Sequence, residues 1–480
     1  MNFNTPLFLF LFLPVFLIIY FFAQPRWRPL IGVLASVLFY SWGQVAYIPL
    51  MIVIIAFNYW IGLRLGAGKS KRIFYLGLIA NIGLLVFFKL LTTYGMAIFF
   101  GLAPLFPQRL SDWLKTLTFP LGLSYISFQV ISYVIDVQRG AVQPEKKFIP
   151  FAFYVLLFPK LLVGPIVRYR TLANELSEPQ ISPSQIASGI RRFILGFAKK
   201  LLIADVLSKV VNAVFGLPIS HATPAMAWLA LVSYALQIYF DFSGYTDMAI
   251  GLASMMGLTF SENFNFPYIS QSVSEFWRRW HISLSSWFRD YVFFPLERRR
   301  IKFIGQPLNI LIVFLLTGLW HSVTLAFLVW GLMHGVFIAL ESLFMGRWLQ
   351  KVFRPLRHIY ALAAILLTWV FFRAPDFTYA LGFLRRLAGD ASGFVQLSFT
   401  QTAPLPFLEP SFWLAFGFGI FFSLPVFPIF KKMFERITAK SPALTLPLMA
   451  VGDLFLLALF VLSVGMMTAS KFLPGIYGSF

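Results

Sequence analysis

The feature that most constrains this chain is a series of long apolar runs separated by short polar turns. A run of about 20 apolar residues, folded as a helix, matches the hydrocarbon thickness of a bilayer. Only 12% of the residues are charged, whereas soluble proteins carry about 25%, so the chain cannot cover a large water-facing surface. The pattern predicts an all-helical protein that crosses a membrane many times.

The apolar runs predict about eleven to thirteen spans with re-entrant and interfacial helices between them, because several runs are too short to cross at right angles. The run at 226–256 is too long for one simple crossing. No soluble domain or internal repeat is visible, so we expect one transmembrane domain over residues 1–480. The runs cover residues 6–22, 30–42, 46–63, 73–90, 94–105, 117–137, 148–166, 194–215, 226–256, 303–320, 325–343, 359–372, 412–430 and 444–468.

The formal charge of +21 comes from Lys and Arg in the short loops between apolar runs. Basic loops of this kind mark the cytoplasmic ends of membrane helices, and no separate basic domain is present. We expect a multi-pass protein of the cytoplasmic membrane that contacts lipid and binds no nucleic acid. The basic clusters are Arg26 and Arg28; Lys69, Lys71 and Arg72; Lys199 and Lys200; Arg298, Arg299, Arg300 and Lys302; Lys431 and Lys432.

The first apolar run precedes Arg26 and Arg28 instead of following a basic segment. That order is wrong for a cleaved signal peptide. We expect this run to be the first spanning helix, with its N-terminus outside.

The chain has no cysteine, which excludes disulfides and any covalent intermediate on a thiol. It also has no GxSxG elbow, HExxH pair or phosphate-binding glycine loop. We therefore expect no metal and no bound cofactor. Any group transfer would run directly between substrates or through Ser, Thr, His or a carboxylate.

Two of the five histidines, His321 and His334, lie in apolar context in the stretch LTGLWHSVTLAFLVWGLMHG. Ionisable side chains at membrane depth are costly and mark functional sites. The two are thirteen residues apart, on nearly opposite sides of a continuous helix, so a shared cavity requires a break between them. Gly331 and Gly335 would allow close approach of a substrate or of another backbone.

A second polar segment, SVSEFWRRWHISLSSWFRDYVFFPLERRR, begins at Ser272. Ser272 and Glu275 form a capping box pattern, and the aromatic residues recur at helical spacing. The pattern predicts an amphipathic helix, either an interfacial anchor or a basic face that holds donor phosphates. We expect His281 to be a structural hydrogen-bonding residue.

A third stretch, YFDFSGYTDMAIGL from Tyr239, places Asp241 and Asp247 in an apolar run. We expect these carboxylates to pair with the arginines of the second segment or to bind a cation. A purely structural ion pair is the expectation for Asp247.

In these stretches the sequence resembles the membrane-bound O-acyltransferase superfamily, in its bacterial alginate O-acetyltransferase branch. The shared motifs are YFDFSGYTDMAIG, ENFNFPYISQSVSEFWRRWHISLSSWFRDY, LWH and WGLMHG, together with PLGLSYISF from Pro120 and FPKLLVGPIVRY from Phe158. The motif core spans about 117–345 of the single domain. The resemblance departs at Ser322, where the family usually has Gly, and at PLERRR from Pro295.

The resemblance implies a ring of helices around a central tunnel, in which an acyl thioester from the cytoplasm meets a hydroxyl from outside. It implies that His334 is the catalytic base and His321 a second essential residue. The donor would be acetyl-CoA or an acyl carrier protein, and the acceptor a polysaccharide or a secreted acyltransferase partner. The expected substrate-binding residues are Arg278, Arg279, His281, Ser285, Arg289, Asp241, Tyr245, Asn265, Trp320 and Trp330.

Three functions compete with O-acetylation of a polysaccharide. D-alanyl transfer to teichoic acid is suggested by the shortened loop at PLERRR. A transporter or flippase for polymer precursors would also place polar groups at membrane depth, although the inverted repeats typical of transporters are not seen. An assembly scaffold would need neither histidine.

Overall fold

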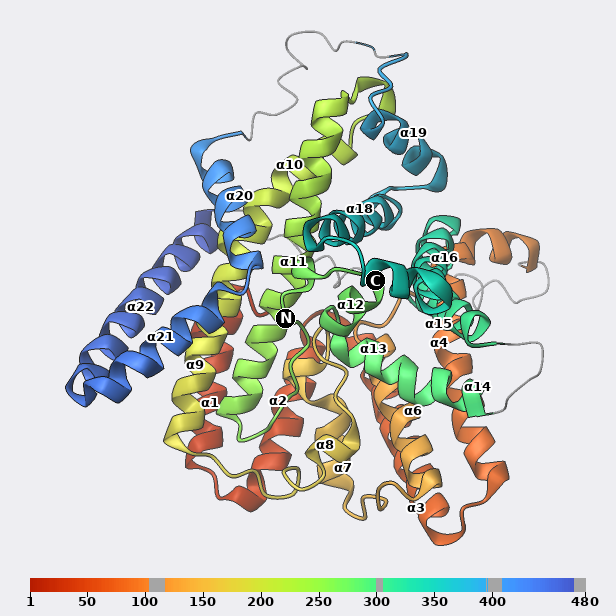
Figure 1. The fold of residues 1–480 in the computed structure, drawn as a ribbon. Coiled ribbons are helices and arrows are strands. Elements are labelled where there is room, and N and C mark those ends of the chain that lie inside the picture. Colours follow the sequence, from red (N-terminus) through yellow and green to blue (C-terminus); the bar gives the residue numbers. More distant parts are fainter. Residues whose placement is uncertain (103–116, 299–304, 394, 396–407, 470–480) are drawn as a thin grey trace.

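The structure, a computed structural model, describes residues 1–102, 117–298, 305–393, 395 and 408–469. Every element in these ranges is a helix (Figure 1). The helices are α1 Leu13–Phe22, α2 Arg28–Gln44, α3 Ile48–Gly68, α4 Lys71–Leu102, α6 Leu123–Arg139, α7 Phe148–Leu156, α8 Tyr169–Leu172, α9 Pro183–Ala198, α10 Asp205–Phe215, α11 Pro224–Met255, α12 Val273–Arg279, α13 Ile282–Phe288, α14 Phe294–Arg298, α15 Gln306–His321, α16 Leu325–Leu340, α17 Gly346–Leu349, α18 Arg354–Arg373, α19 Phe377–Leu387, α20 Pro410–Ser423, α21 Val426–Lys440 and α22 Thr445–Ala469.

The all-helical membrane architecture predicted from the apolar runs is confirmed. Within the described residues, six helices are long and apolar enough to cross a membrane, or up to seven if the bent pair α20–α21 is one span. This is fewer than predicted, because several runs form shorter apolar helices, such as Phe148–Lys160 and Gln306–His321. The basic residues Arg299, Arg300 and Lys302 lie outside the described part of the chain.

Helix α11 runs through the centre of the molecule with α9 along one side (Figure 1). It is one unbroken helix of 32 residues, where the sequence suggested more than a simple crossing. Glycines let the two backbones meet: a Cβ on Gly189 would lie 2.6 Å from the Gly251 carbonyl oxygen, and one on Gly244 would lie 2.7 Å from that of Gly196. Small residues at such a crossing are the usual solution for close helix packing in membranes.

Ion pairs also join α11 to α9 and to its π-helical continuation Lys199–Ala204. The Lys200–Asp241 pair is buried and the two pairs of Asp247 are half-buried. Asp247 pairs with Arg192 at 2.8 Å and with Lys199 at 2.6 Å, and Asp241 pairs with Lys200 at 2.6 Å. The expectation that arginines of the 272–298 segment would supply these partners was therefore wrong. Of the two arginines of α9, Arg192 faces α11, whereas Arg191 pairs with Asp453 of α22 at 2.6 Å.

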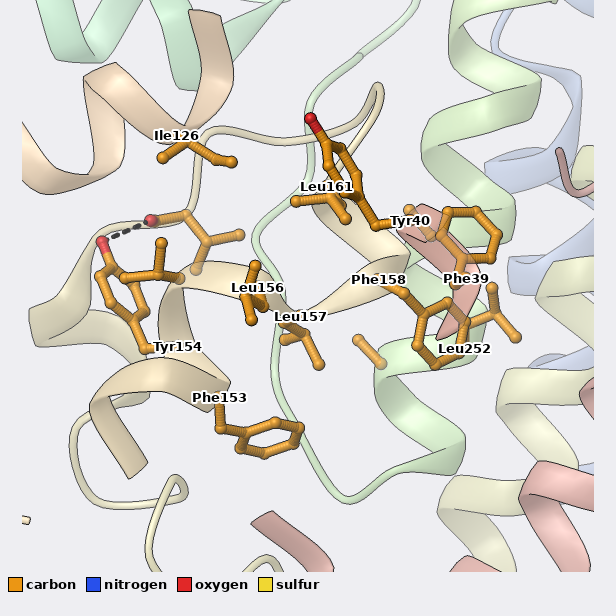
Figure 2. Close-up of a cluster of buried hydrophobic side chains, with 14 of the residues drawn as sticks. Phe39, Tyr40, Ile126, Phe153, Tyr154, Leu156, Leu157, Phe158, Leu161 and Leu252 are labelled. Carbon is orange, nitrogen blue, oxygen red and sulfur yellow. Dashed lines mark hydrogen bonds between the residues drawn. The ribbon is translucent and has the colours of Figure 1, made fainter. Parts of the chain in front are cut away.

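An aromatic and aliphatic core fills the space between α2, α7 and α11 (Figure 2). Phe153 and Phe158 are fully buried, and Phe158 packs against Phe39 of α2 with ring centroids 5.5 Å apart. The hydroxyl of buried Tyr154 donates to the Val167 carbonyl oxygen at 3.1 Å, which satisfies its one polar atom. This core packs α2 and α7 against the central helix α11.

Candidate functional site

His321 and His334 lie on two antiparallel helices that meet at a tight turn. Helix α15 ends at His321, and α16 begins four residues later at Leu325. The predicted break between the two histidines is therefore present. It allows both imidazoles to face the same interior region, which one straight helix would not.

The indole of Trp330 lies between the two imidazoles. Its ring centroid is 5.1 Å from that of His321 and 5.1 Å from that of His334, and both rings stand nearly perpendicular to it. Trp330 is 1% exposed and both histidines are buried. The two predicted catalytic residues thus share one aromatic wall.

Glycines allow α15 and α16 to approach closely enough for this arrangement. A Cβ on Gly318 would lie 2.5 Å from the Phe327 carbonyl oxygen, and one on Gly331 would clash with the Phe314 carbonyl oxygen. Gly331 and Gly335 therefore serve helix packing, one of the two roles that their spacing predicted.

The imidazole of His334 has one nitrogen engaged and the other open. The indole N–H of Trp277, on α12, donates to His334 Nδ1 at 3.2 Å. His334 Nε2 is buried and has no hydrogen-bond partner among the described residues. A buried polar atom without a partner costs free energy, so Nε2 is the atom available to a substrate.

Helix α12 is held at its first turn by two side chains. The Ser272 hydroxyl accepts from the Glu275 backbone N–H at 3.0 Å, as the capping pattern predicted. The buried Glu341 carboxylate, seven residues beyond His334, accepts from the N–H groups of Val273 at 2.7 Å and Ser274 at 2.9 Å. The sequence analysis did not select Glu341. Its position near the end of the apolar run at 325–343 could have identified it, because a carboxylate in such a run is a functional candidate.

The 272–298 segment is not one amphipathic helix, which corrects the prediction. It breaks between α12 and α13, where His281 has a left-handed φ of 44°, a conformation that costs free energy for a residue with a side chain. Buried His281 packs its ring on Phe242 at 4.7 Å and directs Nδ1 to the Asn263 amide oxygen at 3.3 Å. These contacts fit the expected structural role.

The polar residues of this segment diverge instead of forming one basic face. Arg279 pairs with Glu275 at 2.9 Å and donates to the Asn265 carbonyl oxygen at 3.1 Å, while Arg278 is exposed. Ser285 donates to the Trp280 carbonyl oxygen at 3.4 Å. Arg289 lies beside Asp290 in the π-helical turn Arg289–Phe293 after α13.

Two other predicted residues lie on aromatic walls. Trp320 contacts His321 at 4.5 Å, Phe128 at 5.3 Å and His281 at 6.3 Å between ring centroids, so it joins the histidines to α6. Tyr245 stacks on Phe3 at 4.6 Å. Of the predicted set, the structure brings His321, His334, His281, Trp320 and Trp330 together.

A buried lysine next to His321 was missed. Lys89 of α4 donates to the His321 carbonyl oxygen at 2.8 Å, at the end of α15, where a cation is favoured by the helix dipole. Its signal was a lone cation within the apolar run 73–90.

Comparison with known proteins gives consistent matches. Residues 115–381 match the family model for membrane-bound O-acyltransferases. Probable alginate O-acetylase AlgI of Azotobacter vinelandii is 39% identical over 391 residues, which cover 79% of this chain and 76% of that protein. The peptidoglycan O-acetyltransferase of Helicobacter pylori is 34% identical over 426 residues, covering 81% and 80%. The teichoic acid D-alanyltransferase of Bacillus subtilis is 29% identical over 263 residues, covering 52% and 66%.

Proposed function

The chain belongs to the membrane-bound O-acyltransferase family and is a multi-pass membrane O-acyltransferase, and from this premise we propose that it moves an acetyl group from a cytoplasmic thioester to hydroxyls of a polysaccharide outside. The relatives that match over most of their length are named for acetyl transfer to alginate or peptidoglycan. The proposed location is the cytoplasmic membrane, with the basic loops inside.

The observation that carries this proposal is His334, a fully buried histidine with one nitrogen held by Trp277 and the other open. A neutral imidazole takes a proton from a hydroxyl near neutral pH. Ionisable side chains at membrane depth mark functional sites, which supports a role for His334 in proton transfer.

In the proposed reaction the hydroxyl oxygen attacks the thioester carbonyl carbon, so a C–O bond forms and the C–S bond breaks. His334 takes the hydroxyl proton at Nε2 and passes it to the departing sulfur, so no net proton is consumed. Base assistance of this kind contributes roughly 10²–10⁴ in rate, and positioning of the two substrates supplies much of the rest.

The hydrogen bond from Trp277 bears on the base assignment. The indole N–H can only donate, so in the resting ring Nδ1 is unprotonated and the proton lies on Nε2. A ring that accepts a proton at Nε2 must first change tautomer and lose this bond. That loss leaves the buried indole N–H of Trp277 without an acceptor and costs about 1–3 kcal/mol, roughly 5- to 150-fold in rate, which offsets part of the gain from a base.

The two histidines lie at different depths along the proposed path. The Tyr94 hydroxyl donates to the Val323 carbonyl oxygen in the α15–α16 turn at 2.7 Å, and Tyr94 is roughly 35 Å along α4 from basic Lys71. The turn, and His321 beside it, are therefore near the outer side. His334 lies further along α16 from this turn, although its imidazole is at most about 10 Å from that of His321, because each ring centroid is 5.1 Å from the Trp330 centroid. The hydroxyl would therefore pass His321 before it reaches His334.

We propose that His321 orients the incoming hydroxyl, with Trp330 as the wall between the two imidazoles. The donor is acetyl-CoA or an acetylated carrier protein. The acceptor is the polysaccharide itself or a secreted acyltransferase that completes transfer outside.

D-alanyl transfer to teichoic acid is the second candidate. It is favoured by the similarity to the Bacillus subtilis D-alanyltransferase over 52% of this chain. It would use the same histidines with a different acyl group.

The test uses purified protein in liposomes, a labelled acetyl donor inside and cell-envelope polysaccharide outside. We expect transfer by the wild type, a loss of about 10²-fold or more in His334→Ala, and wild-type transfer in His221→Ala, a histidine in the α10–α11 connection. Full activity in a folded His334→Ala protein would reject the assignment. Transfer of D-alanyl but not acetyl groups would select the second candidate.

A further inference from the structure

Four arginines surround one carboxylate at the basic end of the molecule. Arg168 contacts an Asp290 carboxylate oxygen at 2.5 Å, Arg289 at 3.3 Å and Arg170 at 3.5 Å. Arg139, the last residue of α6, donates to the Asp290 backbone oxygen at 3.3 Å. We call these four arginines the arginine cluster.

The cluster carries more positive charge than its carboxylates offset. Besides Asp290, Asp136 is near and accepts from the Tyr291 hydroxyl at 2.7 Å, so four guanidinium groups face two carboxylates. Burial alone would raise the pKa of Asp290, but the contacts with Arg168 and Arg289 hold it below the ordinary value. With both carboxylates ionised, the arginine cluster and its two aspartates together carry a net charge of two positive units.

One arginine of the cluster has a buried donor with nothing to bind. The Arg168 side chain is 9% exposed, and its guanidinium lies over the Tyr291 ring at 5.1 Å. Its Nη2 is buried and has no hydrogen-bond partner among the described residues. An unmet buried donor is costly, and an anion seated between the guanidinium groups would satisfy it.

The arginine cluster lies on the cytoplasmic side by the distribution of basic residues. The Gln138 side chain, next to Arg139, donates to the Lys69 carbonyl oxygen at 3.2 Å. Lys69 is in the α3–α4 turn with Lys71 and Arg72, a cluster of the kind that stays inside.

A continuous line of aromatic rings connects the cluster to the histidines. Tyr291 contacts Trp287 at 5.2 Å, Trp287 contacts Phe128 at 4.3 Å, and Phe128 contacts Trp320 at 5.3 Å between ring centroids. Trp320 in turn lies 4.5 Å from His321. A ligand with its anionic group in the cluster and an extended arm along these rings would point into the site.

We propose that the arginine cluster binds the phosphate of a phosphopantetheine arm, the chemistry that coenzyme A and acyl carrier proteins share. Guanidinium groups bind phosphate in a bidentate manner and more strongly than neutral donors do. The inference rests on the proposed function, in that the arm carries the acyl thioester. It extends the sequence-based expectation that a basic face of the segment from Ser272 holds donor phosphates, since only Arg289 of the cluster belongs to that segment.

The test compares two ligands that differ only in the phosphate, 4′-phosphopantetheine and pantetheine. Binding is measured to purified protein in nanodiscs of neutral lipid, at low and high salt. We expect phosphopantetheine to bind more tightly, with an affinity that falls as salt rises. Arg139→Gln and Arg170→Gln should each weaken its binding about tenfold or more and leave pantetheine binding unchanged. The control is Arg64→Gln, which removes an exposed arginine near the end of α3 that adjoins Lys69. It should change the binding of neither ligand.

Equal binding of the two ligands by the wild type would overturn the proposal. The proposal would also be overturned if anionic lipid vesicles displaced phosphopantetheine and if Arg139→Gln and Arg170→Gln weakened the binding of those vesicles. The cluster would then be a lipid-binding site. Competition by coenzyme A or by a holo carrier protein supports the proposal and identifies the source of the arm. Since binding needs no acyl transfer, phosphate-dependent binding by a protein that transfers nothing would reject the proposed function and leave this site standing.

Discussion

The indole N–H of Trp277 donates to Nδ1 of His334, 57 residues away in the sequence. The bond joins α12 to α16 and leaves Nε2 as the one open nitrogen of a buried imidazole. It therefore sets both the orientation of the ring and the position of its proton.

Replacing Trp277 with Phe tests which role the imidazole has. The variant keeps an aromatic ring and removes the donor, so a base at Nε2 no longer has to break a hydrogen bond. We expect acyl transfer at the wild-type rate or up to about a hundredfold faster, measured in the liposome assay. A hundredfold loss in a folded protein would show that the Nε2 proton is itself the working group, as a donor to the carbonyl oxygen.

Substituting Gly331 with Ala should separate α15 from α16. The added Cβ clashes with the Phe314 carbonyl oxygen, which is backbone and cannot rotate away. We expect a stability loss of about 1–3 kcal/mol and a larger fall in transfer, because His321 moves relative to His334. Gly335→Ala is the milder comparison: there a Cβ would be 3.1 Å from Phe314 Cβ and 3.2 Å from Leu311 Cδ2, so the neighbours need to move by only a few tenths of an ångström. Equal effects of the two variants on transfer would contradict this account.

Glu341→Gln should loosen the first turn of α12. A carboxylate accepts from the Val273 and Ser274 N–H groups with its two oxygens, whereas an amide turns an NH₂ donor toward one of them. We expect about 1–3 kcal/mol lower stability, read as a lower unfolding temperature in detergent, together with slower transfer. The exposed Glu435→Gln, on α21, should leave both unchanged. An unchanged melting temperature in Glu341→Gln would show that the carboxylate does not anchor α12.

Lys200→Met should destabilise the protein more than a triple variant that also neutralises Asp205 and Asp241. Lys200 contacts Asp205 at 2.7 Å and Asp241 at 2.6 Å in a buried site, so its removal leaves two carboxylates without their cation. We expect a loss of about 3–5 kcal/mol in thermal or denaturant unfolding. Adding Asp205→Asn and Asp241→Asn should recover part of that loss. If the triple variant is less stable than Lys200→Met, the carboxylates are held by other groups and the argument fails.

The helical membrane architecture and the break between His321 and His334 could be predicted, because apolar run length and helical periodicity are local properties of a sequence. The contacts that define the site could not. Trp277 and Glu341 act across long sequence separations, and Arg168 meets Asp290 122 residues away. The amphipathic pattern of 272–298 continues through His281 without a break. No local sequence signal therefore predicted a left-handed backbone conformation at this residue.

Glu341 follows His334 on the same helical run, and it holds the turn from which Trp277 extends to His334. These contacts form a closed ring of interactions. The imidazole of His334 accepts from Trp277, the start of α12 that carries Trp277 is held by the Glu341 carboxylate, and Glu341 follows His334 on the same helical run. These contacts couple α12 to α16, so a substitution at any one of these positions should shift the imidazole of His334 and the indole of Trp277 together. The position of this pair relative to His321 is set separately, by the close glycine packing of α15 on α16.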